Sequence, residues 1–401
     1  MRRRVSMMVI SICLVLAAAA LPFGGCAKPG PTAPAEPIKI GLMTALTGSF
    51  SSFGIQLKLG TQTAFDEVGW QVANRPIQLI IEDDQANPDV AVQKVKKLVE
   101  SDRVHILTGV CHGGVALAIR DYVVDQKIPF VFSMAAVRDL TKAKASEYIF
   151  RTSWTDTQSE VPLMPYAYEK LGIHTIVAVS IDYVTGREKV AGIKAAFEKV
   201  GGKVLEEVYT PFGATDFSPY LTKIKGMKGI DAAWVFEPGS AGIQFVRQWG
   251  EYGLGKEMKL IGSTASFGQS FLEQEGDVAL GAVISDTYTH TIDSSENRKF
   301  VEAYEKISGG AVPESPSEAA YDAGKLIIEA IKACKGNVED VPKLLEALKT
   351  AKIKAPRGPF RLDEYQNVVC DMLILKVERV QGELVRNVIA RIPDVGQDWM
   401  P

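Results

Sequence analysis

The sequence predicts an α/β protein made of two doubly wound lobes, each with a mainly parallel sheet. Three observations lead to this fold class. Strand patterns alternate with helical patterns about every 25–30 residues, which is the spacing of βαβ units. The alternation starts again after Trp154. The chain of 401 residues is long enough for two domains of about 150–200 residues each.

The composition is that of a globular protein, with 46% apolar, 23% charged and 8% aromatic residues. The formal net charge of -3 leaves no basic footprint, so we expect no nucleic-acid partner. The five cysteines and four histidines form neither a CxxC pair nor an HExxH motif. The sequence therefore predicts no metal site and no cofactor.

The first residues have the pattern of an export signal. Arginines at 2–4 precede an apolar run over residues 5–21, which predicts a signal peptide of residues 1–25. Gly24 and Gly25 before Cys26 resemble a lipobox, so we expect lipidation of Cys26 and a proline-rich, lipid-anchored tether over residues 26–37. The protein is then exported and held at the membrane, in the periplasm or at the cell surface. Ordinary secretion, with cleavage among the alanines at 17–20, is the alternative.

The elements of the first half follow from apolar runs and turn residues. Short apolar runs predict strands over residues 38–43, 77–81, 104–109 and 129–133. Helical spacing of apolar residues predicts helices over residues 56–68, 89–101 and 115–126. The Asn87-Pro88 pair marks the start of the second helix, and residues 48–54 are expected to form a loop.

The second half repeats the alternation and then changes character. The same patterns predict strands over residues 175–180, 204–209, 232–236, 260–262 and 282–287. They predict intervening helices over residues 158–171, 185–200, 217–227 and 240–252. Helices then follow one another over residues 298–307, 318–334 and 338–351. The chain closes as an antiparallel pair, 372–377 with 384–390, around Gln381-Gly382.

A ligand site is expected where the two halves face each other. In open parallel sheets ligands bind beyond the carboxyl ends of the strands, and clefts between domains are favoured binding sites. Gly113 and Gly114 begin a predicted helix directly after a strand, and backbone N–H groups at such a position favour an anion. Cys111 and His112 are adjacent, but neighbouring side chains rarely aim at each other, so the pair does not predict a nucleophile and its base.

Eight short motifs occur in an order that resembles one protein family. They are Lys39-Ile-Gly-Leu-Met-Thr-Ala-Leu-Thr-Gly48, Phe53-Gly54, Glu82-Asp-Asp84, Asn87-Pro88, Phe150-Arg-Thr152, Asp182-Tyr183 with Gly186, Thr215-Asp-Phe-Ser218 and Gly358-Pro-Phe360. In this order they resemble type I periplasmic binding proteins, and among these the leucine/isoleucine/valine-binding proteins of ABC importers. The resemblance covers about residues 38–392.

The resemblance implies a domain organisation and a role. The family folds as two lobes joined by three crossovers, which would lie near Thr152, Ser285 and Pro359. Lobe 1 would comprise residues 38–152 plus 286–358, and lobe 2 residues 153–285 plus 359–401. The implied role is that of a binding protein and not an enzyme. It closes by a hinge on a small-molecule ligand and is recognised by ABC permease subunits. A sensor input module is an alternative role for the same fold.

The resemblance also implies the residues of the site. From lobe 1 these are an aromatic residue over the ligand, a turn that holds a carboxylate and a loop that holds an amino group: Phe53; His112, Gly113 and Gly114; Ser133, Ala135 and Ala136. From lobe 2 they are Tyr183, Thr185, Phe236, Glu237, Ser263 and Thr264. The structural alternatives are a core phenylalanine, a plain glycine turn, a tight strand end and, for Glu237, an acid at a helix start.

Glu237 decides which ligand is expected. It follows an apolar strand and is predicted to face the cleft, where it could pair with an ammonium group. In the relatives the acid comes from the loop that matches Ser263-Thr264, which carries none here. Either Glu237 replaces that acid or the ligand has no amino group. We expect a branched-chain or other hydrophobic amino acid, with an aromatic or aliphatic carboxylate or an amide as the alternative.

Three cysteines remain after export: Cys111, Cys334 and Cys370. Their spacing selects no pair. The relatives often pair the first of them with a cysteine in the loop after Glu82-Asp-Asp84, and that place falls near Ala86 in this chain. The resemblance therefore implies that Cys111 has no disulfide partner.

Overall fold

A computed structural model describes residues 36–401 of the chain. The predicted signal peptide of residues 1–25, the lipidation site Cys26 and the tether up to residue 35 lie outside the described residues. Within residues 36–401, no helix is both long and apolar enough to cross a membrane.

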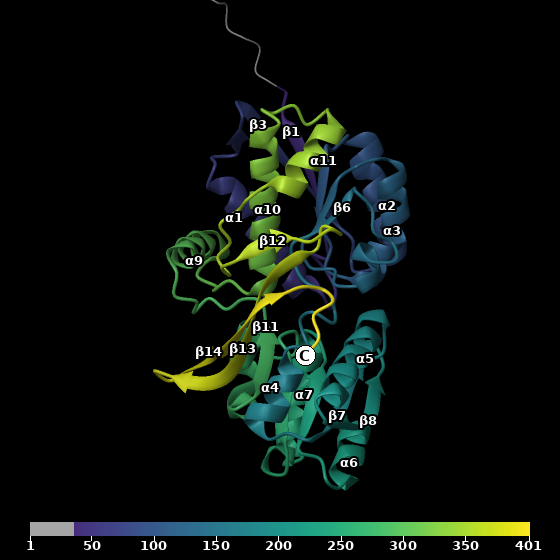
Figure 1. Cartoon of the computed structure of the whole chain (residues 1–401), viewed down its shortest axis with the longest axis vertical. Coiled ribbons are helices and arrows are strands. Elements are labelled where there is room, and N and C mark those ends of the chain that lie inside the picture. The colour runs from purple at the N-terminus through teal and green to yellow at the C-terminus, as the bar shows by residue number, and fades with distance from the viewer. Residues whose placement is uncertain (1–35) are drawn as a thin grey trace, which may run out of the picture. The chain divides into compact units, whose positions relative to one another are not determined.

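Two sheets organise the described chain (Figure 1). The first has, in spatial order, β2 (Gln71–Val72), β3 (Arg75–Asp83), β1 (Ile38–Thr44), β4 (Ile106–Gly109), β5 (Phe130–Phe132) and β6 (Ile149–Arg151). The second has β12 (Phe360–Leu362), β13 (Val368–Val380), β11 (Val283–Asp286), β10 (Lys259–Ser263), β9 (Ala232–Phe236), β7 (Thr175–Ile181) and β8 (Lys203–Thr210), with β14 (Glu383–Val395) paired to β13. Pairing is parallel except at β2 and around β12, β13 and β14.

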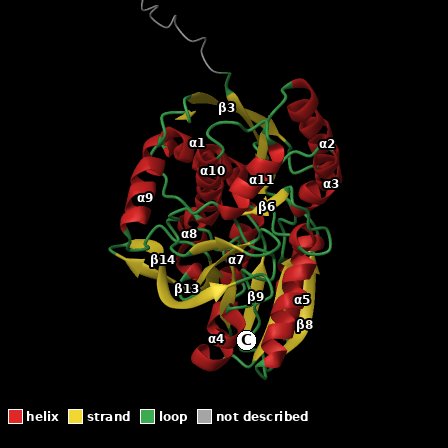
Figure 2. Ribbon diagram, turned by 45° about the horizontal axis from the view of Figure 1, so that its top comes forward, coloured by secondary structure: helices red, strands yellow, loops and turns green. Residues whose placement is uncertain are grey.

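Helices flank both sheets (Figure 2). They are α1 (Ser51–Asp66), α2 (Pro88–Lys96), α3 (Gly113–Asp125), α4 (Leu163–Leu171), α5 (Val184–Lys199), α6 (Ser218–Gly226), α7 (Ser240–Glu251), α8 (Gln269–Glu275), α9 (Ser295–Ser308), α10 (Ser315–Ala333) and α11 (Val341–Thr350). Short helical turns lie at Lys97–Ser101, Arg138–Thr141, Leu254–Lys256 and Gly276–Ala279. The predicted α/β fold with two mainly parallel sheets is confirmed.

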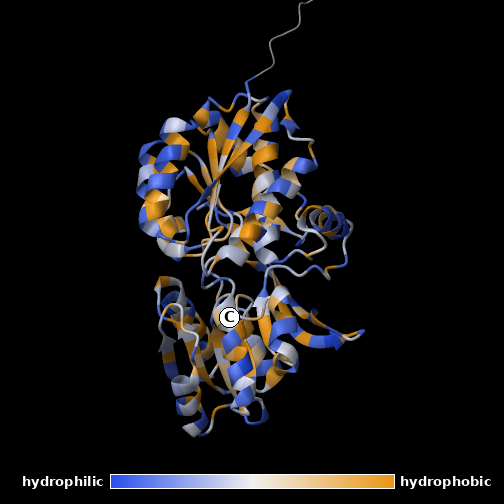
Figure 3. Cartoon of the chain, turned by 180° about the vertical axis from the view of Figure 1, so that it is seen from behind, coloured by the Kyte–Doolittle hydropathy of each residue, from blue (hydrophilic) through white to orange (hydrophobic). Residues whose placement is uncertain are grey.

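The strands at the centre of each sheet are mostly apolar and mostly buried (Figure 3). In β1 every residue except Lys39 is buried, and in β9 every residue is buried. A parallel strand that is covered by helices on both faces has no solvent side, so it shows a continuous apolar run and not an alternation. These runs are what made the strands recognisable in the sequence.

The chain leaves the second sheet after β11 and packs again beside the first. The long helix α10 lies against α1, and α9 and α11 pack on these two helices (Figure 1). The chain then returns, and β12, β13 and β14 complete the second sheet. This element membership supports the predicted lobes, 38–152 plus 286–358 and 153–285 plus 359–401, whose boundaries remain a prediction.

Local differences from the predicted elements have local causes. Helix α1 begins at Ser51, inside the segment expected to be a loop. Helix α4 begins only at Leu163, although a helix was predicted from residue 158. There Gln158 and Thr155 each accept the other's backbone N–H through a side-chain oxygen, and Pro162 disfavours helical geometry in the residue before it. The short elements β2, β6, β12 and α8 were not predicted.

The C-terminal hairpin confirms the predicted antiparallel pair and is longer than expected. β13 and β14 pair from Val380 and Glu383 at the turn to Cys370 and Val395 at the far end. Gln381 and Gly382 at the turn both have positive φ, 52° and 94°. Positive φ at both central residues is the geometry of a type I′ turn, which matches the twist of the flanking strands.

Candidate functional site

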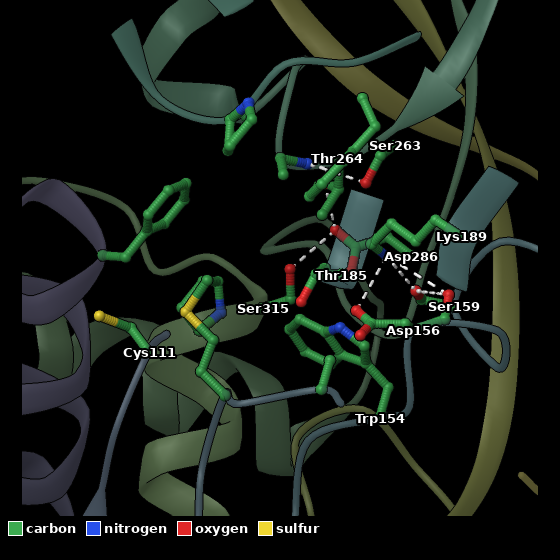
Figure 4. Close-up of a pocket in the computed structure, with 18 of the residues that line it drawn as sticks. Cys111, Trp154, Asp156, Ser159, Thr185, Lys189, Ser263, Thr264, Asp286 and Ser315 are labelled. Carbon is green, nitrogen blue, oxygen red and sulfur yellow. Dashed lines mark hydrogen bonds and ion pairs between the residues drawn. The ribbon is translucent and has the colours of Figure 1, made fainter. Parts of the chain in front are cut away.

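A cavity lies where the carboxyl ends of the two sets of parallel strands meet, as expected for open parallel sheets. Its empty volume is about 730 Å³, counting the part open to solvent. Its apolar side is lined mainly by Phe50, Phe53, Cys111, Met134, Ala136 and Trp154. Its polar side is lined mainly by Asp156, Glu160, Lys189, Ser263, Thr264 and Asp286. Figure 4 shows Cys111 well apart from Asp156, Ser159 and Lys189, which gather together.

Most of the predicted site residues line this cavity. They are Phe53, Gly113, Ala136, Tyr183, Thr185, Phe236, Ser263 and Thr264. They come from α1, from the loops after β4 and β5, from the start of α5 and from the ends of β9 and β10. The remaining predicted residues, His112, Gly114, Ser133, Ala135 and Glu237, are not among the lining residues.

His112 caps the start of α3 and does not line the cavity. Its Nδ1 accepts the backbone N–H of Val115 at 3.3 Å, so the ring caps the start of α3 and the neutral form carries its proton on Nε2. Burial lowers its pKa, which favours this neutral form. The ring stacks on Tyr183 with centroids 5.5 Å apart. Gly114 lies beneath it, because a Cβ there would be 3.0 Å from the imidazole Cε1.

The loop after β5 uses its backbone to hold the strand end. The N–H of Ser133 donates to the carbonyl of Gly109 and the N–H of Ala135 to that of Val110, at 3.1 and 2.9 Å. Both residues are fully buried. The cavity is reached instead by their neighbours in sequence, Met134 and Ala136.

Glu237 points away from the cavity that it was expected to face. Its Oε1 accepts the hydroxyl of Thr210 at 2.7 Å, and its backbone N–H donates to Ser266 Oγ at 2.8 Å. Successive side chains at the end of a strand project to opposite sides, so Phe236 lines the cavity and Glu237 does not. Burial raises the pKa of Glu237 to about 8.

Sequence reasoning missed the acids that do line the cavity: Asp156, Glu160, Asp286 and Glu314. Asp156, Glu160 and Asp286 lie just after β6 and at the end of β11, where the chain passes from one sheet to the other, and Glu314 lies directly before α10. The sequence contained the signal, since the crossovers were predicted near Thr152 and Ser285. Segments that cross between two lobes run along the cleft, so polar residues just beyond a crossover are candidates.

Glu160 and Lys189 form a buried ion pair in which Oε1 of Glu160 accepts three hydrogen bonds and Oε2 accepts none within residues 36–401. Glu160 Oε1 accepts from Lys189 Nζ at 2.6 Å, from Ser263 Oγ at 2.8 Å and from Ser159 Oγ at 3.1 Å. The exposed fractions of Lys189 and Glu160 are only 3% and 1%. A buried ion pair is tolerated when such hydrogen bonds compensate the loss of water. The pair is therefore part of the wall.

Asp286 and Glu314 are also engaged by the protein itself. Asp286 Oδ2 accepts from Thr264 Oγ1 at 2.6 Å and from Ser315 Oγ and Arg386 Nη1, both at 2.9 Å. Arg386 reaches this place from β14 and is fully buried. Glu314 accepts the backbone N–H of Gln269 at 2.6 Å, at the start of α8.

Asp156 differs from the other lining acids. Its nearest cation, Lys189 Nζ, is 3.9 Å from Oδ1, and neither of its oxygens has a hydrogen-bond partner within residues 36–401. The residue is fully buried. Burial raises its pKa to about 8, and Lys189 and the Thr185 hydroxyl lower it less. Among the described residues it is therefore an acid of the cavity wall with a distant cation and no hydrogen bond.

Nothing in the described residues forms a metal centre or an activated thiol. No group of His, Cys, Asp and Glu within residues 36–401 is arranged to hold a metal ion. Cys111, Cys334 and Cys370 are buried and free, so the structure forms no disulfide among them. Burial raises the pKa of the Cys111 thiol to about 12, which keeps it protonated and unreactive.

Comparisons with known proteins agree on the kind of protein. A sequence model described as "Periplasmic binding protein" matches residues 37–382. The "Leu/Ile/Val-binding protein homolog 6" of Brucella suis is 30% identical over 347 residues, which are 85% of this chain and 87% of that protein. The solved ABC transporter substrate-binding protein from Sphaerobacter thermophilus is 37% identical with a TM-score of 0.86, over 90% of this chain and 99% of that chain.

Another similar structure was solved with a bound ligand. It is the solute-binding protein of an ABC transporter from Rhodopseudomonas palustris in complex with 3,4-dihydroxybenzoic acid. It is 33% identical with a TM-score of 0.85 and covers 90% of this chain and 98% of that chain.

Proposed function

We propose which ligand this chain binds, starting from what the chain is. The chain belongs to the periplasmic binding protein family, as a substrate-binding protein of an ABC transporter and not an enzyme. The ligand is a small aromatic carboxylate of the benzoate class, held in the cavity between the two sheets. The observation that carries this proposal is the aromatic lining, with Phe50, Phe53, Trp154, Tyr183 and Phe236 around one space. Flat apolar walls suit a planar ring, and aromatic pairs add about 0.5–1.5 kcal/mol beyond burial of area.

The charges around the cavity support a ligand without an amino group. Glu160 is paired with Lys189 and Asp286 with Arg386, so these acids already have their cations. Glu237, which was expected to bind an ammonium, does not line the cavity. The Rhodopseudomonas palustris protein, which was solved with 3,4-dihydroxybenzoic acid, supports the same ligand class.

We propose that the ligand carboxylate binds at the start of α3. Gly113 lines the cavity and is the first residue of this helix of 13 residues. The first N–H groups of a helix have no partner within the helix, and the helix dipole favours an anion there. A Cβ at Gly113 would be 3.0 Å from Thr185 Oγ1, so glycine keeps the approach to these N–H groups open.

A hydrophobic amino acid, such as a branched-chain one, is the second candidate. The carboxyl group of Asp156, which has no hydrogen-bond partner within residues 36–401, favours it, because a buried acid without a hydrogen bond could take an ammonium group. The name of the Brucella suis relative points to the same ligand class.

Closure around the ligand and recognition by the permease complete the proposed mechanism. Contacts between elements of the two sheets support a closed form. The backbone N–H of Arg138 donates to Glu188 on α5 at 3.0 Å, and the ring of Phe50 stacks on Phe212 with centroids 6.1 Å apart. Small-angle scattering of ligand-free and ligand-saturated protein tests this step, since the radius of gyration should fall on binding.

Export and lipidation at Cys26 are the remaining part of the proposal. The arginines at 2–4, the apolar run and Gly24-Gly25-Cys26 support it. Wild type and Cys26→Ala, expressed in a host that processes lipoproteins, are compared by detergent phase separation. Wild type should enter the detergent phase and the variant the aqueous phase. Equal partition into water would overturn the anchor.

A ligand screen tests the proposed function directly. The protein is unfolded, freed of ligand and refolded, and its melting temperature is measured with benzoate, 4-hydroxybenzoate, 3,4-dihydroxybenzoate, leucine and phenylalanine. A ligand at 100 times its Kd stabilises the folded state by about 2.7 kcal/mol. A benzoate should raise the melting temperature and leucine should not. Stabilisation by leucine alone would replace the first candidate with the second.

A further inference from the structure

We infer that Asp156 selects among aromatic carboxylates by binding a hydroxyl group on the ligand ring. The inference rests on the proposed benzoate-class ligand and adds which members of that class bind best. It makes Asp156 a specificity-determining residue, and it predicts hydroxybenzoates as better ligands than benzoate.

The position of Asp156 is fixed by the backbone. Its N–H donates to the carbonyl of Ala136 at 2.8 Å, which ties the segment after β6 to the loop after β5. The side chain is fully buried and lines the cavity, next to Lys189 and Ser159 in Figure 4. The backbone hydrogen bond therefore holds the main chain of Asp156 at the cavity wall, as recognition of a particular group requires.

Within the described residues, the carboxyl group of Asp156 has a long contact to Lys189 Nζ, 3.9 Å from Oδ1, but no hydrogen-bond partner. Neither oxygen takes part in a hydrogen bond within residues 36–401, whereas Glu160, Asp286 and Glu314 all accept hydrogen bonds from neighbouring groups. Burying a polar group without a hydrogen bond costs free energy, and a ligand group that bonds to it removes this cost. A ligand without such a group leaves the cost in place, which is how a polar site rejects the analogue that lacks it.

A hydroxyl group fits this place better than an ammonium group. The charged groups that influence Asp156 are Lys189, Glu188 and Arg151, with Glu160 bound to Lys189. Lys189 Nζ lies 3.9 Å from Oδ1, so an ammonium group on Asp156 would lie close to a like charge. Burial also favours the protonated carboxyl group of Asp156. This form can donate one hydrogen bond and accept another, and a ligand hydroxyl group can do the same.

Thr185 supplies a second polar contact on the same side. It is one helical turn before Lys189 on α5, so both side chains lie on one face of the helix and both line the cavity. The polar side thus offers a carboxyl and a hydroxyl within a largely aromatic space. This combination suits a ring that carries one or two hydroxyl groups.

The test compares affinities for benzoate and for 2-, 3- and 4-hydroxybenzoate by isothermal titration calorimetry on the refolded protein. In wild type at least one hydroxybenzoate should bind tenfold or more tightly than benzoate. In Asp156→Leu, which has a similar volume and no polar atom, this ratio should fall below three. Asp139→Leu, an exposed acid outside the cavity, is the matched control and should keep the wild-type ratio.

The outcomes separate the inference from the function on which it rests. Equal affinities for all four ligands in wild type, or a wild-type ratio in Asp156→Leu, would overturn the inference alone. If no benzoate binds, the proposed function fails and the inference fails with it. Leucine binding that is lost in Asp156→Asn would identify Asp156 as an ammonium ligand and also overturn it. If Asp156→Leu does not fold, Asp156→Ala gives the same comparison.

Discussion

The apolar and polar sides of the cavity differ in what holds them together. The apolar side consists of separate side chains such as Phe53 and Met134, which need only contact and volume. The polar side is a connected network in which Glu160, Lys189 and Ser263 each complete the hydrogen bonding of another. Loss of one member on the apolar side leaves a space, whereas loss of one member on the polar side leaves a buried charge without its partner. The two sides should therefore respond differently to substitution.

Lys189→Met should have the largest effect, because it removes the cation of the network and keeps the volume. Breaking a buried ion pair by removing one partner destabilises a protein by about 3–5 kcal/mol. Urea unfolding of the refolded protein measures this loss. Lys194→Met is the matched control, since Lys194 lies on the same helix, is 42% exposed in its side chain and pairs with Glu207.

The control should cost less than about 1 kcal/mol, as exposed ion pairs do. Adding Glu160→Gln to Lys189→Met should recover part of the lost stability, because the uncompensated charge is then removed. A loss below about 1 kcal/mol in Lys189→Met would show that the polar side is not an interdependent network.

Glu237→Gln extends the comparison to a buried acid that does not line the cavity. Burial raises the folded-state pKa of Glu237 to about 8 from an ordinary value of 4.5. The folded protein therefore holds a proton that the unfolded chain has lost, and wild type loses this contribution to stability as the pH rises from about 4.5 through 8.

Glutamine cannot ionise and still accepts the Thr210 hydroxyl, so the variant should be more stable than wild type by about 2–4 kcal/mol at pH 8 and equal at pH 4. Melting temperatures at the two pH values measure this difference. Ligand affinity should change less than threefold, because Glu237 does not line the cavity. A tenfold loss of affinity would return Glu237 to the site.

Phe53→Ala tests the apolar side. The ring is 4% exposed, lines the cavity and packs on Phe50 with centroids 5.9 Å apart. Its removal should weaken binding of the best benzoate about 10- to 100-fold, which is about 1.4–2.8 kcal/mol. Tyr365→Ala, an exposed aromatic residue outside this cavity, should leave the affinity within threefold. Calorimetry that finds equal affinities for both variants would contradict the aromatic lining as the main contact.

Among the main residues that line the two sides, the sequence predicted Phe53 and Ala136 on the apolar side and Ser263 and Thr264 on the polar side, and it missed the others for physical reasons. Strands such as β5 and β9 are read from continuous apolar runs, and residues from the segments that follow them line the cavity. The direction of each side chain in a loop was not readable, so Met134 and Ala136 line the cavity where Ser133 and Ala135 were also expected. A shift of one residue along an extended segment reverses the side that a side chain faces.

The polar side depends on residues that are far apart in the sequence. Asp286 is completed by Arg386 from β14, which is 100 residues further along the chain. No local sequence pattern indicates such a distant partner. Glu237 is predicted as the cleft acid only because it follows a recognisable strand. The crossovers near Thr152 and Ser285 were predicted, and the acids next to them could have been proposed from that prediction.

The smallest expected effect concerns one contact outside the cavity lining, between the loop after β5 and helix α5. The carboxylate of Glu188 on α5 accepts the backbone N–H of Arg138 from the loop after β5, at 3.0 Å. This bond can exist only when the two sheets are close, so it stabilises the closed form and not the open one. A hydrogen bond in a partly exposed place contributes about 0.5–1.5 kcal/mol. Glu188→Ala should therefore weaken ligand binding about two- to tenfold, through faster dissociation. Glu198→Ala, on the same helix and exposed, should have no effect on the dissociation rate measured by stopped flow. An equal change in both variants would show that the contact between Arg138 and Glu188 does not take part in closure, and that the aromatic and polar sides hold the ligand without it.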